Sequence, residues 1–507
     1  MGSSGSATRW HILLCVDREL WGVVVGPVRI LLGFMGDPLM WIVKPLPFVT
    51  TFVEGVNEAI ETYTPGFGLS RIQRAWLSFC ITAVLITNSV CWAKFERASI
   101  GSYSLAALSW MFRHAKIDWE QLLHRSVKGI LDRYGITQGY LVLDDTDKKR
   151  SKSTQKIAYV HKLKDKASGG FIQGQCIVFL VLVTPKITVP VSFSFYMPDP
   201  ELSAWYREDK KLRKQGVPPK QRPPKPPKKD AYPTKQEISL RLLAQFRSDH
   251  PTIKVKCVNA DSLYGTEVFL DEASAIFDQT QVISQLRSNQ KVRFRNRELS
   301  VTDYFSSYPG TPQKVRIRGG EEITAIVGSA RLYVCAHHKK RFVIAVKYEG
   351  EEEYRYLVAK DLSWRTIDIV QAHTLRWLVE VFIQDWKSHE GWGTLTQQTG
   401  EEGSCRSLIL SLLVDHCLLL HPEQLARIEN NLPAYTVGSL TDHIKVDCLL
   451  DFIWDLLSCD DPKEKLTLLT DMLKEQVFTL NPSKKHMINR DLGRLEPTPA
   501  LRYRAAG

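Results

Sequence analysis

The sequence predicts an α/β protein in which a core of strands and helices carries a β-rich insertion and is flanked by helical regions. Apolar runs of strand length, separated by helical patterns, fill residues 133–287, and the core resumes at 361–400. Short segments in which cations alternate with other residues occupy residues 288–360. Helical periodicity dominates residues 1–132 and 401–507. These observations divide the chain into a core in two parts, an insertion and two all-α regions.

The core elements follow a defined order. Three strands come first, then a helix, a strand, a helix, a strand and a final helix that carries Glu380. The expected ranges are Gln138–Leu143, Phe171–Thr184, Thr188–Tyr196, Thr234–Phe246, the strand from Ile253 that ends at Asp261, Gly265–Phe277, Thr280–Leu286 and the helix His373–Lys387. This β-β-β-α-β-α-β-α order is that of the RNase H-like fold.

Composition limits the classes of partner and compartment. A chain of 507 residues is long enough for about three domains. Its formal net charge of +12 favours a polyanionic partner. The ten cysteines occur singly and form no Cys-x2-Cys pair. This pattern argues against a zinc ribbon and a disulfide framework, and it favours a reducing compartment.

Two apolar runs near the N-terminus have the composition of buried helices. Trp76–Ala93 is interrupted by Ser, Thr and Asn, and Ile12–Val49 by charged residues, Pro and Gly. A membrane span needs about 20 consecutive, largely apolar residues. We therefore expect no membrane partner. Residues Met1–Ser6 resemble the remnant of an expression tag and are left out of the fold prediction.

The segment His373–Lys387 is the most informative stretch of the chain. On one continuous helix, its four polar groups would share a stripe no wider than about 60°. Most of the remaining surface is apolar, so the helix should be buried, and a buried carboxylate needs a cation. Glu380 between Arg376 and Lys387 therefore suits a metal ligand beside two phosphate-binding cations. The alternative is an internal Arg376–Glu380 salt bridge.

Further acids follow two apolar strands. Asp144 and Asp145 end the first of these strands, and Asp261 ends the second, just before a turn at Gly265. Ligands of α/β sheets gather at the carboxyl ends of strands. Two such acids and one helical acid can hold paired divalent ions through oxygen ligands. The alternative for each acid by itself is a strand-end residue or a helix cap.

These motifs resemble those of a known family. The chain carries Asp145-Thr146, then Val258-Asn-Ala-Asp261, then Arg376-x3-Glu380-x6-Lys387. This order resembles the DDE transposases of bacterial insertion sequences, within them the cut-and-paste group with the signature Tyr-x2-Arg-x3-Glu-x6-Lys. Matching segments run from about residue 69 to residue 411. His373 stands where the signature has tyrosine, and its imidazole N–H can still donate to a phosphate oxygen.

The resemblance implies a catalytic site made of Asp145, Asp261 and Glu380. These carboxylates would hold two Mg²⁺ ions, for which Mn²⁺ could substitute. Strand alternation does not choose between Asp144 and Asp145, because both faces of the strand are apolar. The family places its ligand directly before the Thr, which selects Asp145 and leaves Asp144 as a supporting candidate. His373 joins Arg376 and Lys387 as a candidate phosphate-binding residue.

The resemblance also implies the reaction. Water attack would cleave DNA at the ends of a mobile element, and the freed 3′-hydroxyl would then attack target DNA. Joining two ends to one target needs at least two active sites, so we expect a homodimer on double-stranded DNA. The expected location is the bacterial cytoplasm, in association with the nucleoid. Two alternatives stay open: a nuclease of the same fold without strand transfer, and a transposase-derived DNA-binding protein without catalysis.

Three segments outside the core are candidates for DNA contact. Basic residues recur in the N-terminal helices, which we interpret as a DNA-end recognition domain. The segment 207–235 holds eleven Lys or Arg, three acids and seven Pro, so we expect an extended arm without a core. In the insertion, Arg293 and Arg295 lie on one face of an expected strand, suited to phosphates. The alternative in each case is a solvated surface.

Two further features concern the insertion and the C-terminal region. Relatives that form DNA hairpins hold a flipped base with an aromatic residue of the insertion, commonly Trp. Residues 288–360 contain no Trp, although several Phe and Tyr could stack, so a hairpin route is not established. Helices are expected over Cys405–Leu420, Pro422–Asn430, Val446–Leu457 and Lys463–Leu480, and the last could join two subunits.

Overall fold

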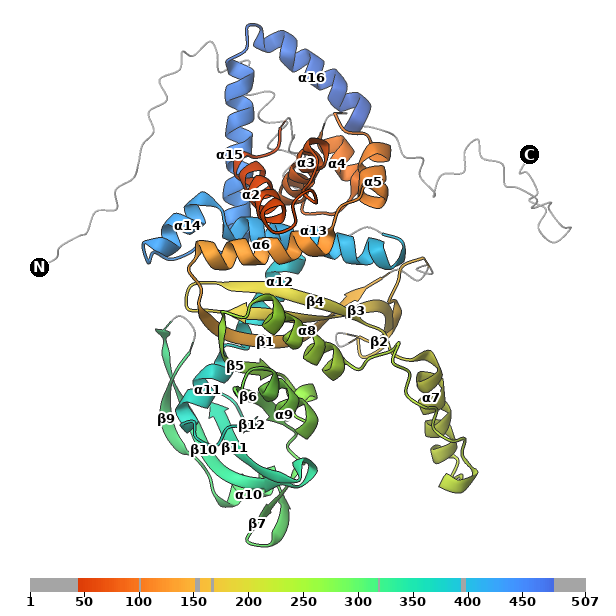
Figure 1. The fold of residues 1–507 in the computed structure, drawn as a ribbon, viewed down its shortest axis with the longest axis vertical. Helices are drawn as coiled ribbons and strands as arrows, with labels where there is room; N and C mark the ends of the chain where they lie inside the picture. The colour runs from red at the N-terminus through yellow and green to blue at the C-terminus, as the bar shows by residue number, and fades with distance from the viewer. Residues whose placement is uncertain are drawn as a thin grey trace, which may run out of the picture.

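The structure is a computed structural model, which describes residues 44–99, 102–150, 156–165, 168–317, 320–393 and 398–477. These residues form a mixed α/β protein built on one large mixed sheet (Figure 1). The N-terminal and C-terminal helices lie together at one end of the sheet, and the insertion forms the opposite end. The α/β class expected from the sequence is therefore confirmed.

The sheet has twelve strands, in the order β2-β3-β1-β5-β6-β12-β11-β10-β7-β8, with β4 paired to β3 and β9 to β10. The pairs β1–β5 and β5–β6 are parallel, and the other pairs are antiparallel. The strands are β1 Gln138–Lys149, β2 His161–Lys164, β3 Phe171–Val183, β4 Thr188–Tyr196, β5 Lys254–Ala260, β6 Gln281–Leu286, β7 Lys291–Phe294, β8 Arg297–Ser300, β9 Thr311–Arg316, β10 Glu322–Val334, β11 Lys339–Tyr348 and β12 Arg355–Ala359.

Strand β1 is longer than the sequence predicts. The apolar run predicts an end at Leu143, but the strand continues to Lys149 because its second half pairs with β3. Its parallel pairing with β5 does stop at Leu143 opposite Ala260. Asp144 and Asp145 therefore lie inside a strand, beyond the point where its parallel neighbour ends. Their predicted position at a strand end is wrong in this respect.

The insertion extends the central sheet and does not form a sheet of its own. β12 pairs with β6 on one side and with β11 on the other, so the strands of the insertion continue the hydrogen-bonded ladder. The core is also continuous, because Val292 and Val343 of the insertion share a buried apolar cluster with Leu141 of β1. A short helix, α10 (Val301–Ser307), covers part of this region.

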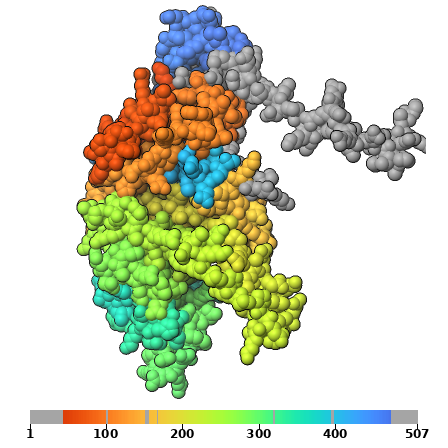
Figure 2. Space-filling view, turned by 45° about the vertical axis from the view of Figure 1, so that its right-hand side comes forward, coloured from red at the N-terminus to blue at the C-terminus, as the bar shows by residue number. Residues whose placement is uncertain are grey.

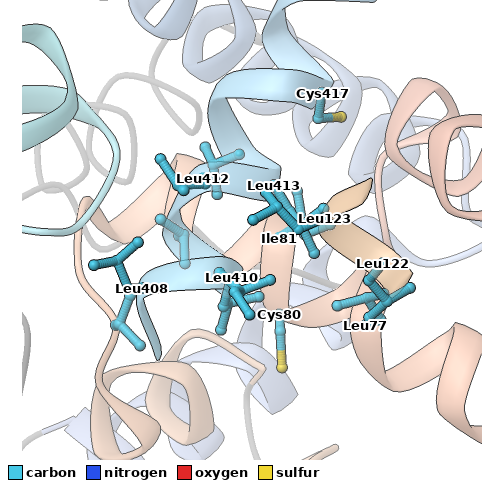
Figure 3. Packing of buried hydrophobic residues seen from close by; sticks show 14 of the residues in the cluster. Leu77, Cys80, Ile81, Leu122, Leu123, Leu408, Leu410, Leu412, Leu413 and Cys417 are labelled. Carbon is cyan, nitrogen blue, oxygen red and sulfur yellow. The ribbon is translucent and has the colours of Figure 1, made fainter. Parts of the chain in front are cut away.

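Helices from both ends of the chain pack into one core beside β4. Apolar side chains of α3, α6 and α13 meet there and exclude water (Figure 3). α3 is well defined by its ends: Ser70 and Gln73 form a capping box, and Asn88 ends the helix in the left-handed conformation. The helices concerned are α2 Pro47–Tyr63, α3 Arg71–Thr87, α4 Trp92–Ala98, α5 Leu105–His114, α6 Trp119–Arg133 and α13 Gly400–Leu419.

The basic segment after β4 contains a helix, contrary to the extended arm that its composition predicts. α7 spans Pro200–Lys214, and the chain returns through a 3-10 turn at Pro219–Gln221 to α8, which spans Lys235–Asp249. Figures 1 and 2 show α7 standing away from the body of the molecule. α9 (Glu267–Ile276) follows β5 and packs with α8.

The segment expected as one helix, residues 373–387, is divided between two. α11 ends at Thr374 and α12 begins at Trp377, with Leu375 and Arg376 between them. The junction is tightened by hydrogen bonds three residues apart, including Arg376 N to His373 O at 3.0 Å. His373 therefore does not share one regular helical stripe with Arg376, Glu380 and Lys387. The helices are α11 Thr366–Thr374 and α12 Trp377–His389.

The C-terminal region is helical, as predicted, through α13 and three further helices. α15 begins well before the expected Val446. The nine cysteines within the described ranges are all free thiols. The run from residue 12 falls almost wholly outside the described residues, as do Met1–Ser6. The bounds are α14 Pro422–Glu429, α15 Val437–Leu457 and α16 Pro462–Val477.

Among the described segments, no single helix has the length and hydropathy that a membrane span needs. Two pairs reach that composition only when joined, and both are sharply bent. α3 with α4 bends by 91°, and α13 with α14 bends by 51°.

Candidate active site

The acidic residues singled out in the sequence lie near the point where β1 extends beyond its pairing with β5. β1 and β5 run side by side up to Leu143 and Ala260, so the residues that follow on each strand are neighbours. On β1 these are Asp144 and Asp145, and after β5 comes Asp261. Because neighbouring residues of a strand point to opposite faces, the two acids of β1 have different surroundings.

Asp144 faces α12 through Arg376. The Arg376 guanidinium donates to Asp144 Oδ2 at 3.0 Å and also contacts Glu380 Oε1, so one cation bridges the two carboxylates. Further along α12, Lys387 contacts Thr146 Oγ1 and donates to the backbone carbonyl of Asp147 at 3.2 Å. α12 is thus tied to β1 by two cations, both of which belong to the predicted motif.

Asp145 lies on the other face of β1, near the start of α8. Its Oδ2 accepts a hydrogen bond from Lys235 Nζ at 2.6 Å, and Cys176 Sγ of β3 lies 3.5 Å away. Ligand atoms of Asp145, Asp147 and Cys176 lie within 4.8 Å of one another, so this group could hold a metal ion. Asp147 Oδ1 is buried and has no hydrogen-bond partner among the described residues.

Burial and neighbouring acids raise the pKa values of two carboxyl groups of the site. Burial is the main cause that raises the pKa of Asp144 to about 6, and Asp261 and Asp145 raise it further, whereas Arg376 lowers it. Burial also raises the pKa of Asp261, and the charge of Asp145 adds to that effect. Asp261 Oδ1 accepts a hydrogen bond from Leu263 N at 2.8 Å, which fixes its side chain at the strand end.

These donors suit a hard divalent cation. Burial removes water from the Asp144 carboxyl group and raises its pKa, and a bound cation would stabilise the charged form of this group. One oxygen of Asp147 has no hydrogen-bond partner among the described residues. Burial raises the pKa of the Cys176 thiol far above its usual value, so its sulfur stays protonated and is a poor ligand. The oxygen donors therefore favour Mg²⁺ or Mn²⁺ over a thiolate-bound metal.

Comparison with known proteins identifies the family. Residues 71–331, just over half of the 507 residues, match the family described as DDE superfamily endonuclease. The chain belongs to the DDE superfamily endonucleases. The match includes Asp144, Asp145 and Asp261 and ends before α12. This family implies nuclease activity on DNA and dependence on a divalent metal ion.

Two solved structures resemble parts of this DDE endonuclease at low overall similarity. One is Ciona intestinalis endonuclease V in complex with a 24mer DNA containing an inosine followed by a ribo-adenosine, with 11% identity, a TM-score of 0.22, and coverage of 51% of this chain and 89% of that chain. The other is the NurA nuclease from Sulfolobus solfataricus, with 9% identity, a TM-score of 0.22, and coverage of 47% and 72%. No curated protein matches the sequence.

His373 has a different environment from the cations of the DDE endonuclease site. It is 6% exposed, and its Nε2 accepts a hydrogen bond from the Gln285 amide at 3.2 Å. Burial, helped by the charges of Arg376 and Arg355, lowers its pKa to about 3. The imidazole is therefore neutral, and one of its nitrogens is already in use.

Arg293 and Arg295 lie in the distant part of the insertion. β7 and the turn after it are six strands away from β1 in the sheet, at the lower end of Figure 1. Arg293 pairs with Glu298 at 3.2 Å, and Arg295 occupies the turn with φ of 48°. The structure does not bring these two cations together with the acids of the site.

Sequence reasoning missed Lys235, whose partner is Asp145. It also missed Lys148, which lies on β1 beyond the acids, and Arg150, which follows the end of β1. Burial is the main cause that lowers the pKa of Lys148 to about 8, and Arg150 and Lys387 lower it further. The position of these cations directly after the acids was visible in the sequence, whereas Lys235 lies 90 residues from Asp145 and carried no signal of its own.

Proposed function

We propose that this protein is a transposase that cleaves DNA at the ends of a mobile element and joins the 3′-hydroxyl ends to target DNA. The observation that carries the proposal is the single guanidinium of Arg376, which links Asp144 to Glu380 beside Asp145 and Asp261. A DDE endonuclease needs its three acids at one place, and the contact of Arg376 with both Glu380 and Asp144 supports the proposal that the helix acid works beside β1. The order of motifs resembles that of cut-and-paste transposases, and this resemblance is the basis for proposing strand transfer in addition to cleavage.

The proposal includes the RNase H-like character of the core. Strands β1, β3, β4, β5 and β6 with α8, α9 and α12 follow the expected order. The core then comprises residues 133–287 and 361–400, with the insertion at 288–360. Residues 1–132 and 401–507 would form the helical regions that bind DNA ends and a second subunit.

Asp145, Asp261 and Glu380 would hold two Mg²⁺ ions, or Mn²⁺ in their place. Such ions, when bound, lower the pKa of an attacking water or hydroxyl and stabilise the leaving oxygen. Asp144 keeps Arg376 in place, and Arg376 and Lys387 offer N–H donors to phosphate oxygens near the cleaved bond. Orientation of the phosphate by these two residues makes in-line attack possible.

Replacement of Glu380 by Gln tests the site while keeping the shape of the side chain. We expect cleavage of element-end DNA to fall by at least about 10³-fold, because the variant loses an anionic ligand. DNA binding measured in EDTA should stay within about twofold of the original. The matched control is Glu429→Gln, which removes an exposed ion pair with Arg133. Cleavage at an undiminished rate in the Glu380 variant, or in EDTA, would contradict the proposal.

Strand transfer separates a transposase from a nuclease of the same fold. DNA ends that already carry a free 3′-hydroxyl, incubated with the protein, Mg²⁺ and a supercoiled plasmid, should give joined products on an agarose gel. Cleavage of intact ends without any joining would favour the nuclease. DNA binding without either reaction would favour a transposase-derived binding protein.

A homodimer is part of the proposal because two ends must reach one target. α15 offers a surface for a second copy: Val446, Leu450, Trp454 and Leu457 are each about half exposed or more, at spacings of four, four and three residues. Such spacing places them on one face of the helix. Trp454→Ser should shift the protein from dimer to monomer in sedimentation velocity at micromolar concentration, whereas the exposed-site control Lys463→Gln should not.

The N-terminal helices would bind the element ends. Their cations are not all available, because Arg74 pairs with Glu54 at 2.9 Å and Arg125 and Lys128 pack over the Tyr63 ring. Double-stranded DNA is the proposed partner, and the proposed location is the bacterial cytoplasm, in association with the nucleoid. The other basic residues of these helices are Arg71, Lys94, Arg97, Arg113, His114, His124 and Arg133, and Lys116 lies between α5 and α6.

A further inference from the structure

The segment between β4 and α8 forms a projecting arm, here called the α7 arm (residues 200–234). Its two ends lie beside the active site, since Tyr196 is the last residue of β4 and Lys235 the first of α8. Lys235 Nζ lies 5.3 Å from the centre of the Tyr196 ring and 2.6 Å from Asp145. The arm therefore starts beside the site. Figure 2 shows that it projects from the body of the molecule.

One face of α7 is held by the returning chain. Trp205 Nε1 donates to the carbonyl of Pro223 at 2.8 Å. Asp209, which is only 5% exposed, accepts from Arg222 at 3.0 Å and from Arg213 at 2.7 Å. The single buried acid of the arm is thus paired with two guanidinium groups, and the arm is folded before it meets a partner.

The opposite face carries a stripe of four cations. Arg207, Lys210, Lys211 and Lys214 follow the i, i+3, i+4, i+7 spacing, which places them within an arc of about 100° on one side of the helix. All four are exposed. Within the described residues, none of them forms a salt bridge, and the only side-chain hydrogen bond of this group runs from Arg207 Nε to the Ser203 carbonyl at 3.3 Å.

This stripe disfavours the helix in isolation. Like charges three or four residues apart repel one another and destabilise a helix, and the stripe contains four such pairs. Contacts on the other face keep the helix folded despite this repulsion. Binding to a polyanion would make the contribution of the stripe favourable, because each cation that neutralises a phosphate releases a condensed counterion.

We propose that the α7 arm binds the phosphate backbone of duplex DNA that flanks the cleaved bond, with Arg207, Lys210, Lys211 and Lys214 as the contact stripe. The inference rests on the proposed function, since it takes the substrate to be DNA. Fifteen helical residues span about 22 Å, which corresponds to roughly six base pairs of duplex. The arm would contact phosphates whatever the base sequence, because its stripe offers charge without a base-reading geometry.

Salt dependence of DNA binding tests the arm. The variant Arg207→Gln/Lys210→Gln/Lys211→Gln/Lys214→Gln is compared with the unchanged protein on a 40-base-pair duplex of arbitrary sequence, by fluorescence anisotropy in EDTA. The slope of log K against log salt should become shallower by about 2 to 4, since each lost phosphate contact contributes about 0.9. The change to Gln also removes the repulsion along α7, so the helix should persist in far-UV circular dichroism.

Three further variants set the scale of the effect. Lys254→Gln/Lys463→Gln removes two exposed charges, one at the start of β5 and one on α16, and should change the slope by less than 1. Arg207→Lys keeps all four charges of the stripe and should retain the original slope. Replacement of residues 203–229 by a short Gly-Ser linker removes the stripe together with six other cations, and it should show a loss at least as large as that of the quadruple variant.

The outcomes separate the arm from the catalytic proposal. An unchanged slope in both the quadruple and the linker variants would overturn the arm proposal, whether or not the protein cuts DNA. A reduced slope supports the arm even where Glu380→Gln leaves cleavage intact, because binding is measured without metal. If the slope falls by the same amount per removed charge in the quadruple variant as in the two-charge control, the effect is one of net charge in general. That result would also overturn the proposal.

Discussion

The ammonium group of Lys235 lies 2.6 Å from the carboxylate of Asp145, at the point where the α7 arm joins α8. Both side chains are about four-fifths buried, so the pair is shielded from solvent more than a surface salt bridge is. A cation of the protein thus neutralises the acid proposed as a metal ligand. Metal binding at Asp145 must compete with this contact.

Removal of Lys235 should therefore strengthen metal binding. We expect Lys235→Gln to bind Mn²⁺ about three- to tenfold more tightly, because breaking the ion pair no longer opposes binding. Isothermal titration of Mn²⁺ into the DNA-free protein measures this directly, with Lys254→Gln as the control. Weaker binding in the variant would show instead that Lys235 orients Asp145 for the metal.

Replacement of Asp144 by Asn and of Asp145 by Asn should have different effects on metal affinity. Asp145→Asn is expected to reduce both cleavage and Mn²⁺ affinity by at least about tenfold, since it removes a ligand. Asp144→Asn should leave Mn²⁺ affinity within about threefold and reduce cleavage, because Arg376 loses one of its two anchors. The opposite pattern of affinities would assign the metal ligand to Asp144.

His373 should matter for stability and not for phosphate binding. His373→Phe removes the acceptor of the Gln285 hydrogen bond in a buried position, which should cost about 1–3 kcal/mol of unfolding free energy. Because burial holds the pKa of His373 near 3, no charge is lost at neutral pH. The salt dependence of DNA binding should therefore be unchanged. A shallower slope of log K against log salt in the variant would indicate that His373 binds phosphate.

The buried pair Glu390 and Asp415 should make stability depend on pH. Glu390 is fully buried and Asp415 is 6% exposed. Burial raises the pKa of Asp415 to about 7 and that of Glu390 well above its usual value, and Asp385 adds repulsion to both. The folded protein therefore keeps protons that the unfolded chain releases above about pH 4.

The sign of the effect follows from this difference in protons. Since the folded state binds more protons, the free energy of unfolding should fall between pH 4 and pH 7, by up to about 1.4 kcal/mol per pH unit for each group. Asp415→Asn should flatten this decline, so the variant should melt above the original protein at pH 8 and closer to it at pH 5. A melting temperature that rises with pH through this window in the original protein would contradict the assignment.

The sequence was sufficient for most core elements because their apolar periodicity is strong. β4 has the predicted bounds, and α8, α9 and β6 differ from their predicted ends by three residues or fewer. β1 could not be delimited in this way: its second half is polar, and it is a strand only because β3 pairs with it. Tertiary pairing decided that boundary, not local preference.

Two other differences have similar causes. α7 was not expected because Pro and Lys dominate its segment, yet the Pro residues all lie outside the helix interior, and Asp199 caps its first turn. The junction at Leu375–Arg376 contains neither Gly nor Pro, so no residue type marked it. In the site, family motifs named the acids, but only the fold could show that Asp144 and not Asp145 shares Arg376 with Glu380.

Because β1 continues through the site as one strand, the number of residues in it matters. Since strand side chains alternate, deletion or insertion of a single residue between Gly139 and Asp144 would exchange the surroundings of the two adjacent carboxylates. Lys235 and Arg376 would then each meet the wrong acid. Insertions and deletions of residues should therefore be tolerated in the loops of this chain but not between Gly139 and Asp144.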